Sequence, residues 1–206
     1  VPLGSMSSLG DGLLNNDYVY SGRIASLTSL DLSNQGSGLS INDLTGISDF
    51  ISLQDLNISQ NNIDNLNVSS NLQLDRLYCA NNGINSIDLS QNSALNYLSI
   101  TGNPLFSLNL TNNINLDTIV CDNTGITSLD LSSNNQLSFL NCMSSSLYSL
   151  DLRNGNNLNI SYFNTTACPN LSCVNVDDPN WSSLNWPNID AQTIFSNNCA
   201  IPQVDF

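Results

Sequence analysis

The sequence contains no histidine, and charged residues make up only 10% of its 206 residues. Lysine and glutamate are also absent, so every acid is an aspartate and the three bases are Arg23, Arg76 and Arg153. Without imidazole, Ser-His-Asp and Cys-His catalysis and most zinc sites are excluded. We therefore expect a protein that is not an enzyme and that needs no cofactor and no metal ion.

Positive charge is scarce as well, because seventeen acids against three bases give a formal net charge of −14 at pH 7. Such a chain repels phosphate backbones and anionic lipid headgroups, which excludes nucleic acid and membrane surfaces as partners. No apolar run reaches the roughly eighteen residues that a membrane span needs, so we expect no membrane insertion. Good helix formers are rare while Asn and Ser abound, which argues against long helices.

What the sequence does contain is a gapless repeat of 21 residues. Five copies align when their first leucines are placed in register, at Leu53, Leu74, Leu95, Leu116 and Leu137. A degenerate sixth copy starts at Leu158, and an earlier one at Leu27 carries an insertion before Leu53. Each copy has two halves with the core L-x-x-L-x-L, beginning for example at Leu74 and Ile84. Positions one, four and six of each half must be apolar, because coils stacked about 4.8 Å apart bury them.

The form L-x-x-L-x-C-x-x-N-x-L-x-x-L-D-L-S-x-N resembles the leucine-rich repeats of internalin J-type surface proteins and of secreted Bacteroidetes proteins, over roughly residues 27 to 176. The flanking segments LTGISDF and CVNVDDPNW are similar to caps in flavobacterial relatives. The resemblance implies a right-handed leucine-rich-repeat solenoid of mainly short parallel β-strands with little helix, capped at both ends. We expect these segments: a cloning scar (1–6), an N-terminal cap (7–26), the repeats (27–173) and a C-terminal cap (174–206).

Cysteines recur at the sixth position of the first half-repeat, which the family calls a cysteine ladder. That column is predicted to contain Ile58, Cys79, Ile100, Cys121, Cys142 and Phe163. Cysteine behaves there as a small hydrophobe, and parallel stacked side chains point the same way, so we expect no bridge between Cys121 and Cys142. A second column is predicted to cap the turns with polar side chains, namely Asn61, Asn82, Asn103, Thr124, Ser145 and Thr166.

Three further cysteines lie outside the ladder. Cys168 and Cys173 fall on inward positions of the last half-repeat, where core filling is the simplest interpretation. Together with Cys199 they allow three single bridges, among which the sequence does not choose. The family resemblance favours Cys173 with Cys199, which would close the C-terminal segment over the end of the solenoid and imply an oxidising, extracellular compartment.

The outward positions of the second half-repeat are nearly uniform. They form one column of Ser86, Ser107, Ser128 and Ser149 and another of Asp88, Asn109, Asp130 and Asp151. This uniformity indicates a scaffold. Calcium needs six to eight oxygens converging on one point, and a column supplies about one carboxylate per coil, so we expect no metal site there.

The outward positions of the first half-repeat vary from copy to copy. The third positions are Ser29, Asp55, Arg76, Tyr97, Thr118, Phe139 and Ile160, and the fifth positions are Asp31, Asn57, Tyr78, Ser99, Val120, Asn141 and Tyr162. Exposed aromatic and aliphatic side chains on one sheet are typical of an interaction surface. The alternative is that the rings cover one another as ordinary cross-strand pairs. The candidate partner-binding residues are Arg76, Tyr78, Tyr97, Val120, Phe139, Ile160 and Tyr162.

The resemblance to internalin-type adhesins implies a secreted or cell-surface recognition module that binds a protein partner on a host or neighbouring cell. A carbohydrate-binding module is the first alternative, because stacked Tyr rings beside Asn and Asp side chains can hold sugar rings. A structural spacer that carries another domain is the second. Chemistry of the surface, and not the fold alone, has to separate these functions.

Overall fold

The computed structural model of this protein describes residues 21–199 except 35, 37 and 39. The expected cloning scar at residues 1–6 and most of the expected N-terminal cap at 7–26 lie outside the described residues. So does the end of the expected C-terminal cap, from residue 200 to 206.

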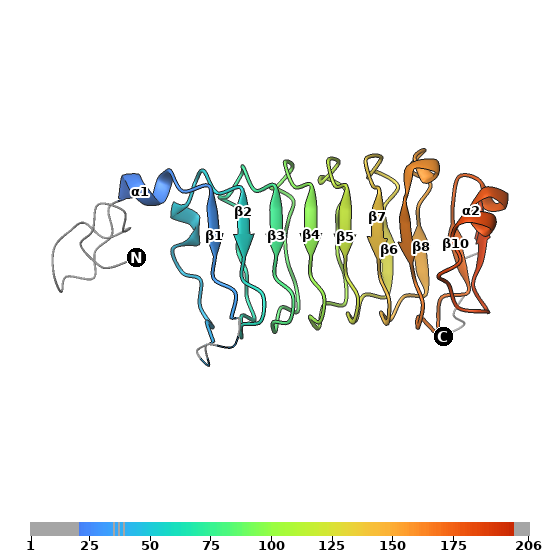
Figure 1. Ribbon diagram of the computed structural model, residues 1–206, viewed down its shortest axis with the longest axis horizontal. Coiled ribbons are helices and arrows are strands. Elements are labelled where there is room, and N and C mark those ends of the chain that lie inside the picture. The colour runs from blue at the N-terminus through green and yellow to red at the C-terminus, as the bar shows by residue number, and fades with distance from the viewer. Residues whose placement is uncertain (1–20, 35, 37, 39, 200–206) are drawn as a thin grey trace, which may run out of the picture.

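The described chain forms an elongated stack of coils that runs from the N-terminal to the C-terminal end of the molecule (Figure 1). Seven parallel strands within the described residues form one sheet, which we name the first-half sheet, in the order β1-β2-β3-β4-β5-β7-β9. The strands are β1 (Ser29–Asp31), β2 (Asp55–Asn57), β3 (Arg76–Tyr78), β4 (Tyr97–Ser99), β5 (Thr118–Val120), β7 (Phe139–Asn141) and β9 (Tyr162–Asn164). The predicted solenoid of short parallel strands is confirmed.

A second sheet lies on the other side of the coils, and we name it the second-half sheet. Its described strands are β6 (Ser128–Asp130), β8 (Ser149–Asp151), β10 (Cys173–Asn175) and β11 (Ile194–Ser196), in the order β11-β10-β8-β6. In the earlier coils, as far as they are described, the second half is extended but makes only an isolated bridge, between Leu66 and Ile87. The expected strands on two sides are therefore present only in the C-terminal half of the described solenoid.

Helical structure in the described chain is short. It consists of α1 (Ser21–Ala25), η1 (Ile47–Asp49), η2 (Asn157–Asn159) and α2 (Pro179–Asn185). Asp178 begins α2 by accepting hydrogen bonds from the backbone N–H groups of Asn180 and Trp181, at 3.0 and 3.1 Å, and proline follows at the first helical position. No helix among the described residues has the length and apolar character to cross a membrane.

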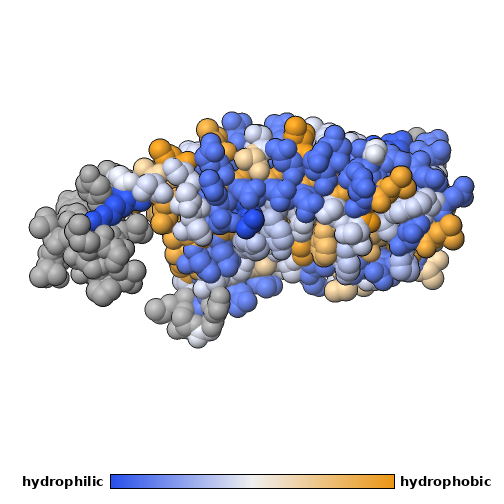
Figure 2. Space-filling model, turned by 45° about the horizontal axis from the view of Figure 1, so that its top comes forward, coloured by the Kyte–Doolittle hydropathy of each residue, from blue (hydrophilic) through white to orange (hydrophobic). Residues whose placement is uncertain are grey.

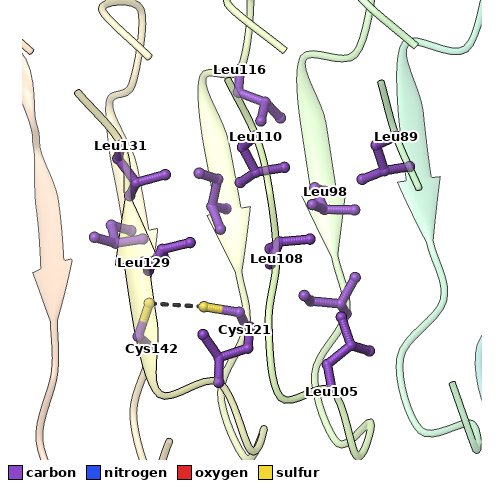
Figure 3. Packing of buried hydrophobic residues seen from close by; sticks show 14 of the residues in the cluster. Leu89, Leu98, Leu105, Leu108, Leu110, Leu116, Cys121, Leu129, Leu131 and Cys142 are labelled. Carbon is purple, nitrogen blue, oxygen red and sulfur yellow. Dashed lines mark hydrogen bonds between the residues drawn. The ribbon is translucent and has the colours of Figure 1, made fainter. Parts of the chain in front are cut away.

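The core is a continuous column of inward side chains (Figure 3). The predicted cysteine ladder is confirmed, because Cys79, Cys121 and Cys142 are all buried and reduced. The sulfur atoms of Cys121 and Cys142 lie 2.8 Å apart. Burial raises the pKa of Cys79 to about 12. A hydrogen bond with Cys121, together with burial, raises the pKa of Cys142. The ladder thiols are therefore protonated core groups.

Asparagine side chains join neighbouring coils. Asn82 donates from its amide nitrogen to the carbonyls of Ile58 and Cys79, at 3.0 and 3.1 Å, and its amide oxygen accepts from the N–H of Ile63 at 3.1 Å. This confirms the predicted turn-capping role of that column. Thr124 keeps one of these bonds, donating to the carbonyl of Cys121 at 2.8 Å.

A second asparagine column escaped the sequence analysis. Its members are fully buried: Asn71, Asn92, Asn113 and Asn134. Asn92, for example, donates to the carbonyls of Val68 and Asn71, both at 3.0 Å. These side chains satisfy carbonyl groups that the turn between the two half-repeats would otherwise bury without a partner.

The expected register fails in the last repeat. Phe139 pairs with Tyr162, so Ile160 takes the place of Leu137 and this coil has 160 − 137 = 23 residues instead of 21. The residue with a left-handed backbone confirms the shift, since it recurs every 21 residues up to Ser144 and then falls on Ala167. The two added residues accommodate the turn of η2, which leaves Leu158 67% exposed.

Several predicted positions change with this register. Ile160 is wrong as a solvent-facing residue, because it occupies inward position one and is 4% exposed. Phe163 packs at position four, in register with Leu140, so the ladder column ends instead at the buried Thr165. Cys168, and not Thr166, continues the polar turn column; its sulfur lies 3.2 Å from the carbonyl oxygen of Cys142.

Candidate functional site

The outward face of the first-half sheet collects the candidate residues, except Ile160. With the corrected register, the third-position column is Ser29, Asp55, Arg76, Tyr97, Thr118, Phe139 and Tyr162. The fifth-position column is Asp31, Asn57, Tyr78, Ser99, Val120, Asn141 and Asn164. Tyr162 therefore lies beside Phe139 and not in the column of Val120.

The rings on this face form two pairs. The centroids of Tyr78 and Tyr97 are 4.6 Å apart with planes tilted by 33°. Those of Phe139 and Tyr162 are 4.3 Å apart with an angle of 8°, which is a stacked arrangement. Burial, and the neighbouring Tyr78, raise the pKa of Tyr97. Each ring thus covers one face of its partner and presents the rest to solvent, so mutual covering and exposure coexist.

The two ring pairs are separated by a single strand. β5 lies between β4 and β7 and presents Thr118 and Val120, both half-buried. The face therefore offers two aromatic sites with a small, mildly apolar strip between them.

The fifth position has a structural task in most coils, on both sides of the solenoid. A side-chain oxygen there accepts a hydrogen bond from the backbone N–H two residues later and so closes the turn after the strand. Such bonds link Asp31 to Ser33, Asn57 to Ser59, Asp88 to Ser90, Asn109 to Thr111, Asp130 to Ser132, Asn141 to Met143, Asp151 to Arg153 and Asn164 to Thr166. In three successive first-half strands the position is held instead by Tyr78, Ser99 and Val120, which have no carboxylate or amide oxygen.

The N-terminal end of the same face contains a polar pocket of about 350 Å³. Its lining residues are Ser29, Leu30, Asp31, Asp55, Asn57, Arg76 and Tyr78. Arg76 is half-exposed and lies 3.6 Å from a carboxylate oxygen of Asp55 and 3.5 Å from one of Asp75. Hydrogen bonds from Ser33 lower the pKa of Asp31, which keeps this carboxylate ionised at neutral pH.

The second-half face carries apolar side chains that the sequence analysis missed. Phe106 and Tyr148 are 68% and 50% exposed, at the position just before the serine column. A further row of exposed aliphatic residues follows the turn between half-repeats: Ile51, Leu72, Ile114 and Leu158. Figure 2 shows such apolar patches as separate areas on a largely hydrophilic surface. Their repeat spacing was visible in the sequence, but polar residues at Ser93 and Asn135 interrupt the row.

The C-terminal end differs between the two sheets. A disulfide joins Cys173 to Cys199, whose Cα atoms are 5.9 Å apart. Cys173 lies in line with Ser149, at an outward and half-buried position, so the expected inward position was wrong. Trp186 instead covers the end of the first-half sheet, stacked on Phe163 with a centroid distance of 4.6 Å. In the described chain, no cluster of three or more Cys or Asp side chains is arranged to hold a metal ion.

Stacked 21-residue coils, an inward leucine and cysteine column and parallel three-residue strands define a leucine-rich-repeat solenoid. No protein-family model matches the chain, and no curated protein matches it. Solved structures do match. The functional domain of InlJ from Listeria monocytogenes, described as including a cysteine ladder, superposes with a TM-score of 0.61 and 24% identity over 82% of this chain and 42% of that one.

Two other solved structures extend the comparison. The internalin inlF from Listeria monocytogenes gives a TM-score of 0.64 at 18% identity, over 85% of this chain and 58% of that one. The leucine-rich-repeat ectodomain of the plant receptor kinase GASSHO1/SCHENGEN3 from Arabidopsis thaliana, in complex with CASPARIAN STRIP INTEGRITY FACTOR 2, gives 0.66 at 16% identity, over 84% and 22%. The chain spans about half the length of the internalins it matches. The fold is therefore that of internalin-type leucine-rich-repeat proteins.

Proposed function

We propose that this chain is a recognition module that binds a protein partner through the outward face of the first-half sheet. The observation that carries the proposal is the replacement of the turn-closing oxygen by Tyr78, Ser99 and Val120 in the middle of this sheet. These coils give up a local stabilising hydrogen bond, and side chains suited to binding stand there instead. Residues that weaken a local structural rule without a structural gain are expected at functional sites.

The ring pairs support the same face. Tyrosine and phenylalanine combine large apolar area with few rotatable bonds, which favours them at the energetically important centres of protein interfaces. Each pair is held in place by stacking, so little side-chain entropy is lost when a partner covers it. Arg76, Tyr78, Tyr97, Val120, Phe139 and Tyr162 remain the proposed contact residues.

A secreted or cell-surface location fits the proposal. The bond between Cys173 and Cys199 persists in oxidising compartments and is rare in the cytosol. The internalin and receptor-ectodomain structures that share the fold add support for a binding function.

A glycan partner is less well supported. Sugar-binding platforms present ring faces to the sugar, whereas Phe139 and Tyr162 stack one face of each ring against the other. A structural spacer needs no departure from the uniform turn residues, so it leaves Tyr78 and Val120 unexplained.

The test is a selection of binders against the immobilised protein, from phage-displayed random peptides of about twelve residues, long enough to cross the sheet. A glycan array is run in parallel. The Tyr97→Ser/Phe139→Ser variant should lose about thirty-fold in affinity for the selected peptides, equivalent to about 2 kcal/mol if either ring is a hot spot. The Asp88→Asn/Asp130→Asn variant should bind like the unaltered protein, because both acids lie on the other face.

Circular dichroism and melting curves must show that both variants fold. Binding that survives loss of the rings but not of the aspartates would place the site on the second-half face and refute the proposal. Glycan binding that depends on the rings, with no peptide selected, would replace it by the carbohydrate-binding alternative.

A further inference from the structure

Charge on the binding face is strongly one-sided. Among the described residues in the strands of the first-half sheet or directly adjoining them, Arg76 is the one base, and Asp55 and Asp75 lie on either side of it. The acids of this face and its rims are Asp31, Asp55, Asp75, Asp117 and Asp122. The described partners of Asp117 and Asp122 are the uncharged donors Thr118, Thr101 and Asn141, which leave the negative charge in place.

This charge is concentrated at a pocket. Asp31 and Asp55 lie side by side on β1 and β2, and both line the 350 Å³ pocket that Tyr78 borders. A carboxylate pair beside an aromatic ring is suited to a Lys or Arg side chain, since the ring face also attracts cations. Arg76 fills this role only in part, because its guanidinium is shared between Asp55 and Asp75.

The spacing of the pocket and the ring pairs limits the shape of a partner. Strands lie about 4.8 Å apart, so the first ring pair on β3 and β4 is about 10 Å from the pocket and the second, on β7 and β9, is about 24 Å from it. An extended chain advances about 3.3 Å per residue. A chain lying across the strands therefore reaches the two ring pairs about three and about seven residues from the pocket.

We propose that the partner recognised by the first-half sheet is an extended cationic polypeptide segment. Its Lys or Arg side chain enters the pocket between Asp31 and Asp55, and apolar side chains about three and seven residues away lie on the ring pairs. The inference rests on the proposed function and specifies its ligand. A neutral or acidic segment would leave the carboxylates without a counter-charge, and an acidic one would also be repelled by the net charge of −14.

The selected peptides test this inference directly. They should be enriched in Lys or Arg, with apolar residues at about the third and seventh positions from the cation. Affinity is then measured by calorimetry for the protein, for Asp31→Asn/Asp55→Asn and for the matched control Asp88→Asn/Asp130→Asn. Both variants lose two charges, and asparagine still has an oxygen to accept the Ser33, Ser90 and Ser132 bonds.

We expect the Asp31→Asn/Asp55→Asn variant to lose about tenfold in affinity and the control to change less than about twofold. Added salt should weaken binding to the unaltered protein more than binding to that variant. Equal losses in the two variants would mean non-specific attraction and overturn the inference. Selected peptides without cations would overturn it too.

The ring variant separates the two levels of the proposal. If Tyr97→Ser/Phe139→Ser loses binding while Asp31→Asn/Asp55→Asn keeps it, the sheet binds a partner that is not read by charge, and only the cationic inference fails. If the selected peptides bind all variants equally, or if no peptide is selected, both the protein-binding function and its cationic ligand are wrong.

Discussion

The first-half and second-half sheets belong to the same coils, and their inward leucine columns are equally buried. Outward, they differ. The second-half face repeats Ser and Asp or Asn, and its fifth-position oxygens close the following turns. The first-half face keeps this arrangement at both ends but replaces it in the middle with Tyr78, Ser99 and Val120. In a repeat protein, the chain itself thus serves as its own reference: positions that repeat do structural work, and positions released from that work are available for recognition.

The ends of the two sheets differ as well, and the largest expected effect tests this. Trp186 is 3% exposed, stacks on Phe163 and meets Phe195 and Trp181 edge-on. Trp186→Ala should lower the free energy of unfolding by about 3 to 5 kcal/mol, because it leaves a cavity over the end of the first-half sheet. Urea unfolding measures it. A loss below about 1 kcal/mol would show that the tryptophan is not what closes this sheet.

A covalent bond closes the second-half sheet, and its removal is expected to rank next. The Cys173→Ala/Cys199→Ala variant should lose about 3 kcal/mol, because the bridge closes a 26-residue separation and restricts the unfolded chain. Reductant should lower the melting temperature of the unaltered protein to that of the variant. If Cys199 reacts with a thiol-blocking reagent before reduction, the bridge is absent in solution.

The sixth inward position also distinguishes the two halves, with cysteine in the first and leucine in the second. Cys121→Ala should cost about 1 to 2 kcal/mol, and Leu131→Ala in the same copy should cost more, about 2 to 5 kcal/mol, because it removes more buried volume. In the native state the buried Cys79, with a pKa of about 12, should resist alkylation at pH 8. Rapid labelling of Cys79, Cys121 and Cys142 would contradict a closed ladder.

The uniform aspartates of the second-half face should contribute little each. Asp130→Ala removes the acceptor of the Ser132 N–H bond, which is 2.9 Å long, and should cost about 0.5 to 1 kcal/mol. Asp130→Asn retains an acceptor and should cost less. Equal losses in both variants, measured by thermal unfolding, would mean that charge matters and the turn bond does not.

Acid should affect these turns in a predictable direction. Hydrogen bonds from Ser90 lower the pKa of Asp88, so the folded state holds this proton more weakly than the unfolded chain does. The stability that ionised Asp88 contributes is present above the ordinary aspartate pKa of about 4 and is lost as the pH falls through the lowered value. The melting temperatures of the unaltered protein and Asp88→Asn should therefore converge below about pH 4, and a constant difference would contradict this.

The repeat predicted the fold and most of the binding face, because its gapless spacing assigns a column to every residue from Leu53 to Asn141. It failed after Arg153, where both Leu158 and Ile160 can serve as the first apolar position. Packing decides between them: Phe163 is accommodated at position four beside Trp186, and only the smaller Thr165 stands at the ladder position. Such a choice depends on contacts with a segment distant in the sequence, so local pattern could not make it.

The aromatic pairing was equally beyond the pattern. The columns place Tyr78 and Tyr97 on adjacent strands, but their diagonal approach depends on side-chain rotamers. Exposed residues such as Phe106 and Leu72 were overlooked because attention to the strands neglects the turns. The charge of the pocket was visible as Asp31 and Asp55, yet only the strand register shows that the two residues are neighbours.

The 21-residue register also shapes how the chain acquires its structure. Each strand of the first-half sheet hydrogen-bonds only to the coils directly before and after it, so most long-range contacts close loops of a single coil's length. Loops of that size form with modest entropy loss, and each finished coil is a template for the next. Folding should therefore start in the uninterrupted central coils and spread outward, with the lengthened coil around Ile160 and the aromatic closure by Trp186 joining last.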